Sequence, residues 1–482
     1  MLWSFIESFT RMGIGFAIGI ILARLLSPEE FGLIGMLTVF LAVAGTFTDA
    51  GFTQALIRKQ DCTDTDFSTV FYFNLGTGVC LYGLLFIFAP YVAAFYEEPE
   101  LTSLLRVLGC LVIINSFTII QRTILTKRVD FKLQAKISVI TTILSGILGI
   151  YMAFKGFGVW SLVAKNISQS ILASVFLWLW NQWRPILVFS KESFTSLFGF
   201  GSKLMVSSLI DTLGRNIYLL VVGKVFSAEV LGYYTRAMMF RDLPSSNLSA
   251  IIARVSFPVL SQLQGDTAQL KAAYRRLITS SMLIAFVLML GMAASAEAMI
   301  ITLIGEQWRE SIILLQSLCI VGMLYPLHSL NLNMLNVQGR SDLFLRLEII
   351  KKTMIIPVVL IGMKYGLLAM ISGMMVTSII AYFLNSYWSG REIDYSSWNQ
   401  IVDILPSFLV AATMAGFVYL LGQLLDYNYF VIFALQVLAG GISTVLLCEI
   451  FKLEAYRYIK ATALAKLLPL LKNVSKRQAS QS

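Results

Sequence analysis

Long runs of apolar residues follow one another along almost the whole chain, separated by short polar turns. A run of about 20 apolar residues is long enough to cross the hydrocarbon core of a bilayer as an α-helix. The pattern predicts helices over residues 3–26, 31–57, 67–95, 101–124, 134–155, 158–181, 197–223, 229–263, 273–304, 311–337, 344–363, 366–389, 403–424 and 428–450. We therefore expect an all-α, polytopic membrane protein with about 14 transmembrane helices.

Two of the polar turns have related sequences. SPEEFGLIGM at 27–36 aligns without a gap with SAEVLGYYTR at 227–236, which pairs Ser27 with Ser227 and Gly32 with Gly232. Residues 155–171 and 364–380 show a weaker sequence similarity. Repeated units of transmembrane helices around a site between two halves are typical of transporters. The repeat predicts two six-helix bundles around a central cavity, plus two extra helices.

The repeat also gives the domain boundaries. We expect an N-lobe at 1–182, a cytoplasmic linker at 183–196, a C-lobe at 197–390, two extra helices at 391–450 and a basic cytoplasmic tail at 451–482. Ser27 and Glu30 have the spacing of a capping box, so the turn is expected to start the second helix. Ser227 is expected to start the eighth helix in the same way.

Composition supports a membrane location. The chain is 57% hydrophobic and 13% charged, whereas soluble domains carry about 25% charged residues. Its net charge of +10 suggests nucleic acid in a soluble protein, but Lys and Arg here concentrate in alternate loops. That pattern marks the cytoplasmic side of a membrane protein, so we expect both termini in the cytoplasm and no nucleic-acid partner. The tail is either an amphipathic helix on anionic lipid or a basic segment that only fixes topology.

Charged residues within the apolar runs are the candidate site. Such residues are costly in a bilayer and usually face a cavity or one another. The cations that we expect to bind substrate in the cavity are Arg11, Lys165, Arg215, Arg236 and Arg241. The acids that we expect to couple transport to a proton or sodium ion are Asp49, Asp211 and Glu297.

Spacing and chemistry refine this set. Glu7 with Arg11, and Asp211 with Arg215, are four residues apart and therefore share a helix face. For Glu7 and Arg11, a structural ion pair and a substrate contact both remain open. Arg236 breaks the repeat, because the first copy has Met36 at that position. Arginine suits phosphate, since its planar fork donates two hydrogen bonds at once.

No catalytic or cofactor motif is present. The chain has no nucleotide-binding loop, no metal-ligand spacing and no nucleophile elbow. We expect a transporter rather than an enzyme, without a cofactor and driven by a proton or sodium gradient or by the substrate's own gradient. His328 is expected to be a hydrogen-bonded core residue.

Several segments together resemble one transporter family. LARLLSPEEFGLIGM, DAGFTQALIRKQ, VLGYYTRAMMFRDLP, VSFPVLSQLQGD and IGEQWRESIILL are similar to segments of Wzx-type oligosaccharide flippases. The similarity is to the branch of lipopolysaccharide, colanic acid and teichuronic acid exporters in the multidrug, oligosaccharidyl-lipid and polysaccharide exporter superfamily. It spans nearly the whole chain through the twelfth predicted helix.

That resemblance implies a function. It implies alternating access and the transfer of polyprenyl-diphosphate-linked oligosaccharide units from the cytoplasmic to the periplasmic leaflet of the bacterial inner membrane, for cell-surface polysaccharide synthesis. The implied partners are this lipid-linked substrate, membrane lipids and the polysaccharide polymerase machinery.

Other functions remain as alternatives. A multidrug cation antiporter of the same superfamily is expected to have an acidic cavity, whereas this one is basic. A flippase for peptidoglycan precursors would share the chemistry proposed here. A polymerase or membrane glycosyltransferase usually needs a larger extramembrane loop than this chain has. A passive scaffold would tolerate loss of all the buried charges.

Overall fold

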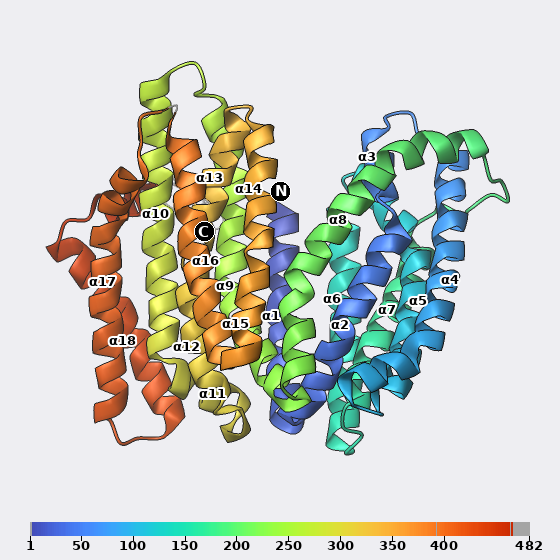
Figure 1. Ribbon diagram of the computed structural model, residues 1–482, viewed down its shortest axis with the longest axis horizontal. Helices are drawn as coiled ribbons and strands as arrows, with labels where there is room; N and C mark the ends of the chain where they lie inside the picture. Colours follow the sequence, from blue (N-terminus) through green and yellow to red (C-terminus); the bar gives the residue numbers. More distant parts are fainter. Residues whose placement is uncertain (1, 392, 463, 466–482) are drawn as a thin grey trace, which may run out of the picture. The chain divides into compact units, whose positions relative to one another are not determined.

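Helices make up almost all of the described chain. The computed structural model describes residues 2–391, 393–462 and 464–465, with side chains from residue 12 onward except at positions 250, 253 and 255. The helices are α1 (Leu2–Leu25), α2 (Pro28–Asp49), α3 (Phe52–Arg58), α4 (Asp64–Tyr96), α5 (Leu101–Lys127), α6 (Phe131–Phe154), α7 (Trp160–Trp180), α8 (Lys191–Val225), α9 (Ala228–Ser261), α10 (Thr267–Ala294), α11 (Ala296–Ile304), α12 (Ser311–Gly322), α13 (Tyr325–Val337), α14 (Ser341–Thr353), α15 (Ile355–Tyr365), α16 (Leu367–Arg391), α17 (Ser397–Leu424) and α18 (Tyr429–Ile450), with a short 3-10 helix, η1 (Glu306–Trp308) (Figure 1). No strand occurs among these residues.

The all-α membrane fold is confirmed. Every predicted segment coincides with one helix or with two consecutive helices. Within the described residues, 11 helices are long and apolar enough to cross a membrane. Helix α9 is not among them, because Arg236, Arg241 and Asp242 lower its hydropathy. The number fourteen therefore stays a prediction.

Several predicted helices are interrupted, and the sequence explains most of the breaks. Between α2 and α3, Ala50 and Gly51 have left-handed backbones, with φ of 46° and 73°. Pro326 lies in the first turn of α13, where its missing N–H costs no helical hydrogen bond. The single helices expected over 31–57, 273–304, 311–337 and 344–363 are each a pair of helices, which corrects the prediction.

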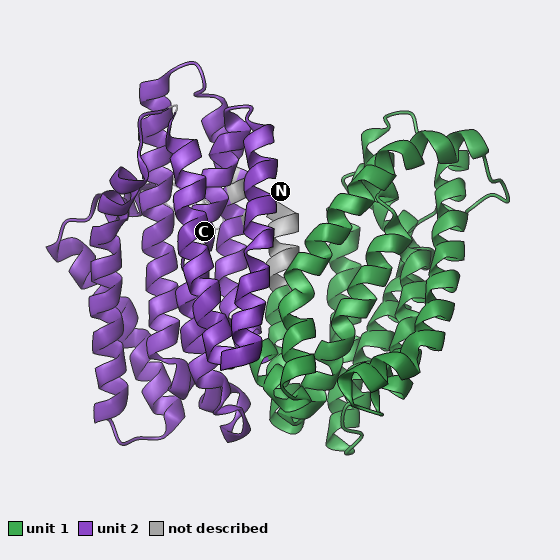
Figure 2. Ribbon diagram, in the orientation of Figure 1, with its two compact units in different colours: residues 1–235 green, residues 236–482 purple. Residues whose placement is uncertain are grey.

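The chain divides into two compact units, residues 1–235 and 236–482 (Figure 2). The first unit contains α1 to α8 and the start of α9. The boundary expected from the repeat lay at residues 183–196, before α8. Helix α8 instead groups with the N-terminal helices, because it packs along α2 and also contacts α3 and α4.

An aromatic core holds one end of the first unit together. Phe52 of α3, Phe71 of α4 and Trp183 of the linker are buried in one cluster with Phe194 and Phe198 of α8 against its edge. Phe194 and Phe198 lie one helical turn apart and stack with ring centroids 5.2 Å apart. These contacts fix the start of α8 against α3 and α4, so α8 begins at Lys191, before the predicted residue 197.

The two copies of the repeated turn pack against each other within the first unit. A Cβ atom on Gly32 would lie 1.6 Å from the carbonyl oxygen of Ala228, and one on Gly232 would lie 1.9 Å from that of Pro28. Pro28 and Ala228 occupy equivalent positions of the repeat, so the contact is reciprocal. Only glycine permits backbones to approach this closely.

The second unit includes α17 and α18, and polar contacts fix α17 in place. Tyr274 of α10 donates to Asn331 Oδ1 of α13 at 2.9 Å, and Asn331 Nδ2 donates to Gln400 Oε1 of α17 at 3.3 Å. Arg275 of α10 donates two hydrogen bonds to Asp403 of α17. The pair α17–α18 is therefore part of the packed body of this unit.

The described part of the tail continues as a helix over residues 454–462. Leu453 and Ala455 are buried in a cluster with Leu283 of α10, Val410 of α17 and Cys448 of α18. The first turns of the tail thus dock on the second unit. The residues from 466 onward lie outside the described chain, so both interpretations of the tail stay open.

Candidate functional site

A polar face runs along the middle of helix α8. Lys203, Ser207, Asp211 and Arg215 follow one another at intervals of four residues, which places them along one side. The Arg215 Nη2 atom lies 2.7 Å from Asp211 Oδ2, as their spacing predicted. The Arg215 side chain is 79% exposed and that of Asp211 42%. The ion pair therefore stands at the protein surface instead of filling the core.

Apolar side chains on the neighbouring face of α8 are also exposed. Val206, Ile210 and Leu213 are 52%, 53% and 44% exposed. Charged groups need water or a polar partner, whereas exposed apolar groups in a membrane protein suit lipid. We call the combination of Lys203, Ser207, Asp211 and Arg215 with these three residues the α8 face. Its chemistry matches a ligand that has a polar head and a hydrocarbon chain.

Helix α2 supports the back of α8. The Thr46 and Thr212 hydroxyl oxygens lie 3.2 Å apart, and Asn216 Nδ2 donates to the Thr212 carbonyl at 2.7 Å. This contact sets the rotation of α8 about its axis, and with it the positions of Asp211 and Arg215.

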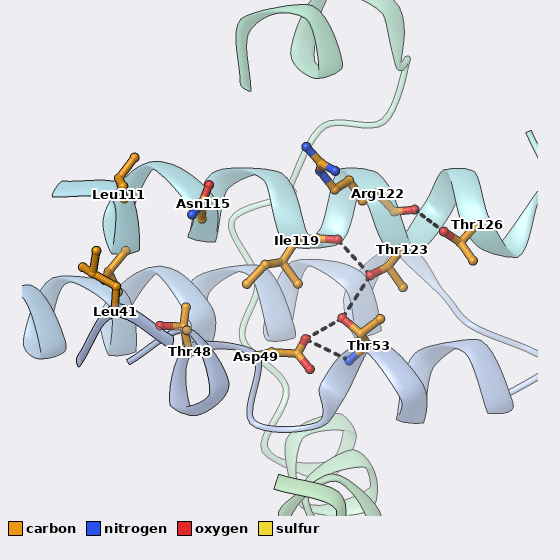
Figure 3. Close-up of a pocket in the computed structure, with 12 residues that line it drawn as sticks. Leu41, Thr48, Asp49, Thr53, Leu111, Asn115, Ile119, Arg122, Thr123 and Thr126 are labelled. Carbon is orange, nitrogen blue, oxygen red and sulfur yellow. Dashed lines mark hydrogen bonds between the residues drawn. The ribbon is translucent and has the colours of Figure 1, made fainter. Parts of the chain in front are cut away.

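A pocket of about 390 Å³ opens between α2–α3 and α5, and Asp49 lines it (Figure 3). Asp49 Oδ1 accepts hydrogen bonds from the Thr53 hydroxyl and from the Thr53 backbone N–H, the latter at 3.3 Å. The Thr53 hydroxyl lies 3.4 Å from that of Thr123, which donates to the Ile119 carbonyl at 2.8 Å. Asn115 and Arg122 of α5 also line the pocket.

These contacts give Asp49 a structural role. Gly51 begins α3 without a side-chain cap, and Thr53 is the second residue of that helix. A carboxylate that accepts from a backbone N–H in the first turn does the work of a cap. Asp49 therefore bridges the break between α2 and α3. Its predicted coupling role remains untested by this geometry.

Lys165 lies half-buried in the second turn of α7, where α6 approaches closely. A Cβ atom on Gly149 of α6 would lie 2.9 Å from Lys165 Cβ. The small residue thus leaves room for the lysine stem. Arg11, together with Glu7, lies in the part of α1 whose side chains are outside the described residues.

The predicted cations of α9 have two different environments. Arg236 is half-buried, with its guanidinium 5.7 Å from the centre of the Trp308 ring. Arg241 is 4% exposed, pairs with Asp242 at 2.6 Å and lies 5.3 Å from the centre of the Tyr325 ring. Burial favours a structural role for Arg241, whereas Arg236 keeps part of its surface accessible.

Glu297 is placed at a helix start and not in a helix interior. Arg309 donates to Glu297 Oε1 at 3.0 Å, to Glu306 and, at 3.4 Å, to the Tyr429 hydroxyl. Glu306, Tyr429 and Glu297, in that order, raise the pKa of Arg309. The network ties η1 to α11 and α18, and the coupling role of Glu297 stays a prediction.

His328 is a hydrogen-bonded residue of the second unit. Its Nε2 lies 2.9 Å from the Ser378 hydroxyl, and its Nδ1 lies 3.5 Å from Asn385 Nδ2. Both partners belong to α16, so the histidine links α13 to α16. This confirms the expected hydrogen-bonded core position.

The structure brings together some predicted residues and adds others. Asp211 and Arg215 are paired, whereas Asp49 lies in a separate pocket of the same unit. Sequence reasoning missed Lys203, Asn115, Arg122 and Trp308. The four-residue spacing from Lys203 to Arg215 was the signal for Lys203. Trp308 gave no signal, because its contact with Arg236 depends on packing between distant segments.

Solved structures share this fold. The chain superimposes on "Lipid II flippase MurJ, inward closed conformation" with a TM-score of 0.76 and 16% identity, covering 95% of this chain and 100% of the other. A multidrug resistance MATE family transporter of the MOP superfamily, in an inward-facing conformation, gives a TM-score of 0.61 at 19% identity, with 80% and 94% covered. At these identities the likeness shows the fold alone.

Sequence relatives point to one biological context. The chain is 27% identical to the teichuronic acid biosynthesis protein TuaB of Bacillus subtilis, over 89% of each chain. It is 25% identical to the lipopolysaccharide biosynthesis protein WzxC of Escherichia coli, over 86% of this chain and 85% of the relative. Residues 21–313, more than half of the chain, match the family model described as "Polysaccharide biosynthesis protein". The chain therefore belongs to the polysaccharide biosynthesis protein family.

Proposed function

We propose that this protein is a flippase that moves lipid-linked oligosaccharide units across the cytoplasmic membrane for the synthesis of a cell-surface polysaccharide. Three relatives act in polysaccharide pathways by name: teichuronic acid, lipopolysaccharide and succinoglycan biosynthesis, the last as a transport protein. The chain shares its fold with a lipid II flippase. The protein is a transporter and not an enzyme.

The α8 face is the observation that carries this proposal. A polyprenyl-diphosphate-linked sugar has an anionic, hydroxyl-rich head and a hydrocarbon chain, which cross the membrane together. Arg215 and Lys203 offer cationic groups to the diphosphate, and Ser207 offers a hydroxyl. Val206, Ile210 and Leu213 offer an apolar path to the lipid chain beside them. In the second unit, Arg236 is proposed by itself as a cation for the diphosphate.

The orientation follows from charge. Lys and Arg gather in alternate loops and in the C-terminal tail, so we place both termini in the cytoplasm. We propose that transport runs from the cytoplasmic to the periplasmic leaflet of the bacterial inner membrane, the direction that delivers precursors toward the cell surface. Contact with a polysaccharide polymerase is part of the same proposal.

Neutralising Arg215 tests the proposal. In a strain that lacks the native gene, Arg215→Gln is expected to reduce surface polysaccharide at least tenfold while the protein accumulates normally in the membrane. Lys191→Gln is the matched control, because Lys191 is exposed at the start of the same helix and lies outside the α8 face. Wild-type polysaccharide output from Arg215→Gln would refute the role of this face.

Coupling to a proton or sodium gradient is proposed for Asp49 and Asp211. Asp49→Asn separates this role from capping, because asparagine still accepts the hydrogen bonds from Thr53 but carries no charge. With coupling at Asp49, the variant is expected to keep its thermal midpoint and lose the gradient dependence of transport in proteoliposomes. Unchanged gradient dependence would leave Asp49 with the structural role alone.

The second candidate is a multidrug antiporter, favoured only by the fold shared with the MATE transporter. Such a protein exports cationic drugs, for which the cations of the α8 face are unsuited. A deletion strain with an unchanged drug-susceptibility profile and lost surface polysaccharide separates the two functions.

A further inference from the structure

A second polar pocket, of about 230 Å³, lies within the second unit. Its walls come from the end of α10 and from α11, α12, α17 and α18, so two of its five helices are the extra pair predicted at 391–450. The residues that line it are Ala294, Glu297, Ala298, Ile312, Gln316, Tyr419, Gly422, Gln423, Tyr429, Ile432 and Gln436.

Three glutamines from three apolar helices meet in this pocket. Gln316 is the one amide in α12 and Gln436 the one amide in α18, while Gln423 lies near the end of α17. Gln436 is buried, Gln316 is partly buried and donates to the Ala293 carbonyl at 3.2 Å, and Gln423 is exposed. A buried amide costs free energy unless its hydrogen bonds are satisfied. These glutamines lie far apart in sequence, so their convergence indicates a site that uses them together.

Gln436 is the central residue of the pocket. It is 4% exposed, and its Nε2 donates to the Val418 carbonyl at 3.0 Å. Its buried Oε1 has no hydrogen-bond partner among the described residues. A Cβ atom on Gly422 would lie 2.3 Å from Gln436 Nε2, so the glycine makes the space in which this amide lies. The amide is held in place with unused capacity for a hydrogen bond.

The pocket is polar, and its lining contains one charged residue. That residue, Glu297, is paired with Arg309 at 3.0 Å, and Arg309 also pairs with Glu306. Such a site offers no cationic group to a phosphate and no free carboxylate to a cationic drug. Amides and tyrosine hydroxyls both donate and accept hydrogen bonds, as a sugar or glycerol hydroxyl does. The aromatic rings of Tyr419 and Tyr429 add flat apolar surface beside them.

We propose that this pocket binds a neutral, hydroxyl-rich group, either a sugar ring or the glycerol headgroup of a phospholipid. The site uses Gln436, Gln316 and Gln423 for hydrogen bonds and the two tyrosines as walls. The pocket lies on helices other than α8. An experiment that refutes binding here therefore leaves the proposed transport at the α8 face untouched, and the reverse also holds. It gives the extra pair α17–α18 a binding role.

The experiment measures binding to the purified full chain in nanodiscs. One arm uses saturation-transfer NMR with free glucose, galactose, mannose and N-acetylglucosamine in phosphatidylcholine discs. The other compares thermal midpoints in discs with and without phosphatidylglycerol. Binding of a sugar, or a higher midpoint with phosphatidylglycerol, is expected; the arm that responds identifies the source of the hydroxyl-rich group.

Variants assign the binding to this pocket. Gln436→Leu and Tyr419→Phe are expected to weaken the responding ligand at least tenfold, and Tyr419→Phe removes only a hydroxyl from a 48% exposed side chain. Ser443→Ala is the control, because Ser443 lies on α18 outside the pocket and donates only to the Gly440 carbonyl. A lack of response in both arms, or a response that Tyr419→Phe and Gln436→Leu leave unchanged, would overturn the proposal.

Discussion

Residues 27–36 and 227–236 start α2 and α9 with the same serine and the same glycine, and each glycine packs against the backbone of the other copy. Past the glycines the copies diverge. Met36 is 1% exposed and lies against Gly223, whereas Arg236 is half-buried beside Trp308. The N-terminal caps differ too, since Glu30 completes a capping box with Ser27 while the equivalent position holds Val230.

The comparison separates packing from chemistry. The glycines are equivalent because both backbones must approach within a distance that no side chain permits. Position 36 of the first copy and position 236 of the second meet different surroundings, so one became core and the other kept a charge. A repeat therefore marks shared packing, and its mismatches mark candidates for function.

Placing arginine at position 36, which is equivalent to position 236, is expected to have the largest effect on stability. Met36→Arg puts an uncompensated charge into a closed site, which costs about 3–5 kcal/mol. The variant is expected to accumulate poorly in the membrane, and its thermal midpoint in detergent is expected to fall sharply. Met36→Leu, which conserves volume, is the control and should cost less than about 1.5 kcal/mol. Normal accumulation of Met36→Arg would show that positions 36 and 236 are not distinguished by burial.

The reciprocal glycine contact comes next. Gly32→Ala and Gly232→Ala each force a methyl group onto a backbone carbonyl, and we expect each to cost about 1–3 kcal/mol, as overpacking does. Thermal unfolding followed by tryptophan fluorescence measures the loss. Gly199→Ala in α8 is the control, because a Cβ atom there meets nothing within 4 Å. A midpoint at or above wild type for Gly32→Ala would contradict the close backbone contact.

Making the second copy like the first tests the chemistry at position 236. Arg236→Met is expected to reduce surface polysaccharide at least tenfold, because it removes a cation from the proposed path of the head. Its stability should fall by about 0.5–2 kcal/mol, the range for a lost contact with an aromatic ring. Arg236→Lys keeps the charge and should recover part of the transport. Full export by Arg236→Met would remove this residue from the site.

The caps give the smallest expected difference. Ser27→Ala removes the hydrogen bond that the hydroxyl accepts from the Glu30 backbone N–H, but the Glu30 carboxylate still accepts from the backbone N–H of residue 27. Ser227→Ala removes the equivalent bond from Val230 and leaves that helix start without a side-chain cap. We expect a loss of about 1 kcal/mol for Ser227→Ala and about half of that for Ser27→Ala, and the thermal midpoints of the two variants measure the difference. Equal losses would mean that Glu30 adds nothing to the first cap.

The sequence by itself determined the class of protein and much of the local structure. Runs of apolar residues required helices, because a backbone in lipid must satisfy its own hydrogen bonds. The capping box at Ser27 and the ion pair of Asp211 with Arg215 also followed from the sequence, since residues three or four apart meet on any helix. These features depend on neighbours along the chain.

Only the tertiary structure decided which distant residues meet. Three contacts join residues of separate elements, so the spacing of these residues in the sequence does not predict them. They are the contacts of Arg236 with Trp308, of Glu297 with Arg309, and of Gln436 with α17. The packing of α8 onto α2 likewise placed the unit boundary after Thr235, although the repeat suggested an earlier one. Helix formation is set by local hydrogen bonds and periodicity, whereas sites are made where side chains from separate helices share one space, and that sharing is fixed only by packing.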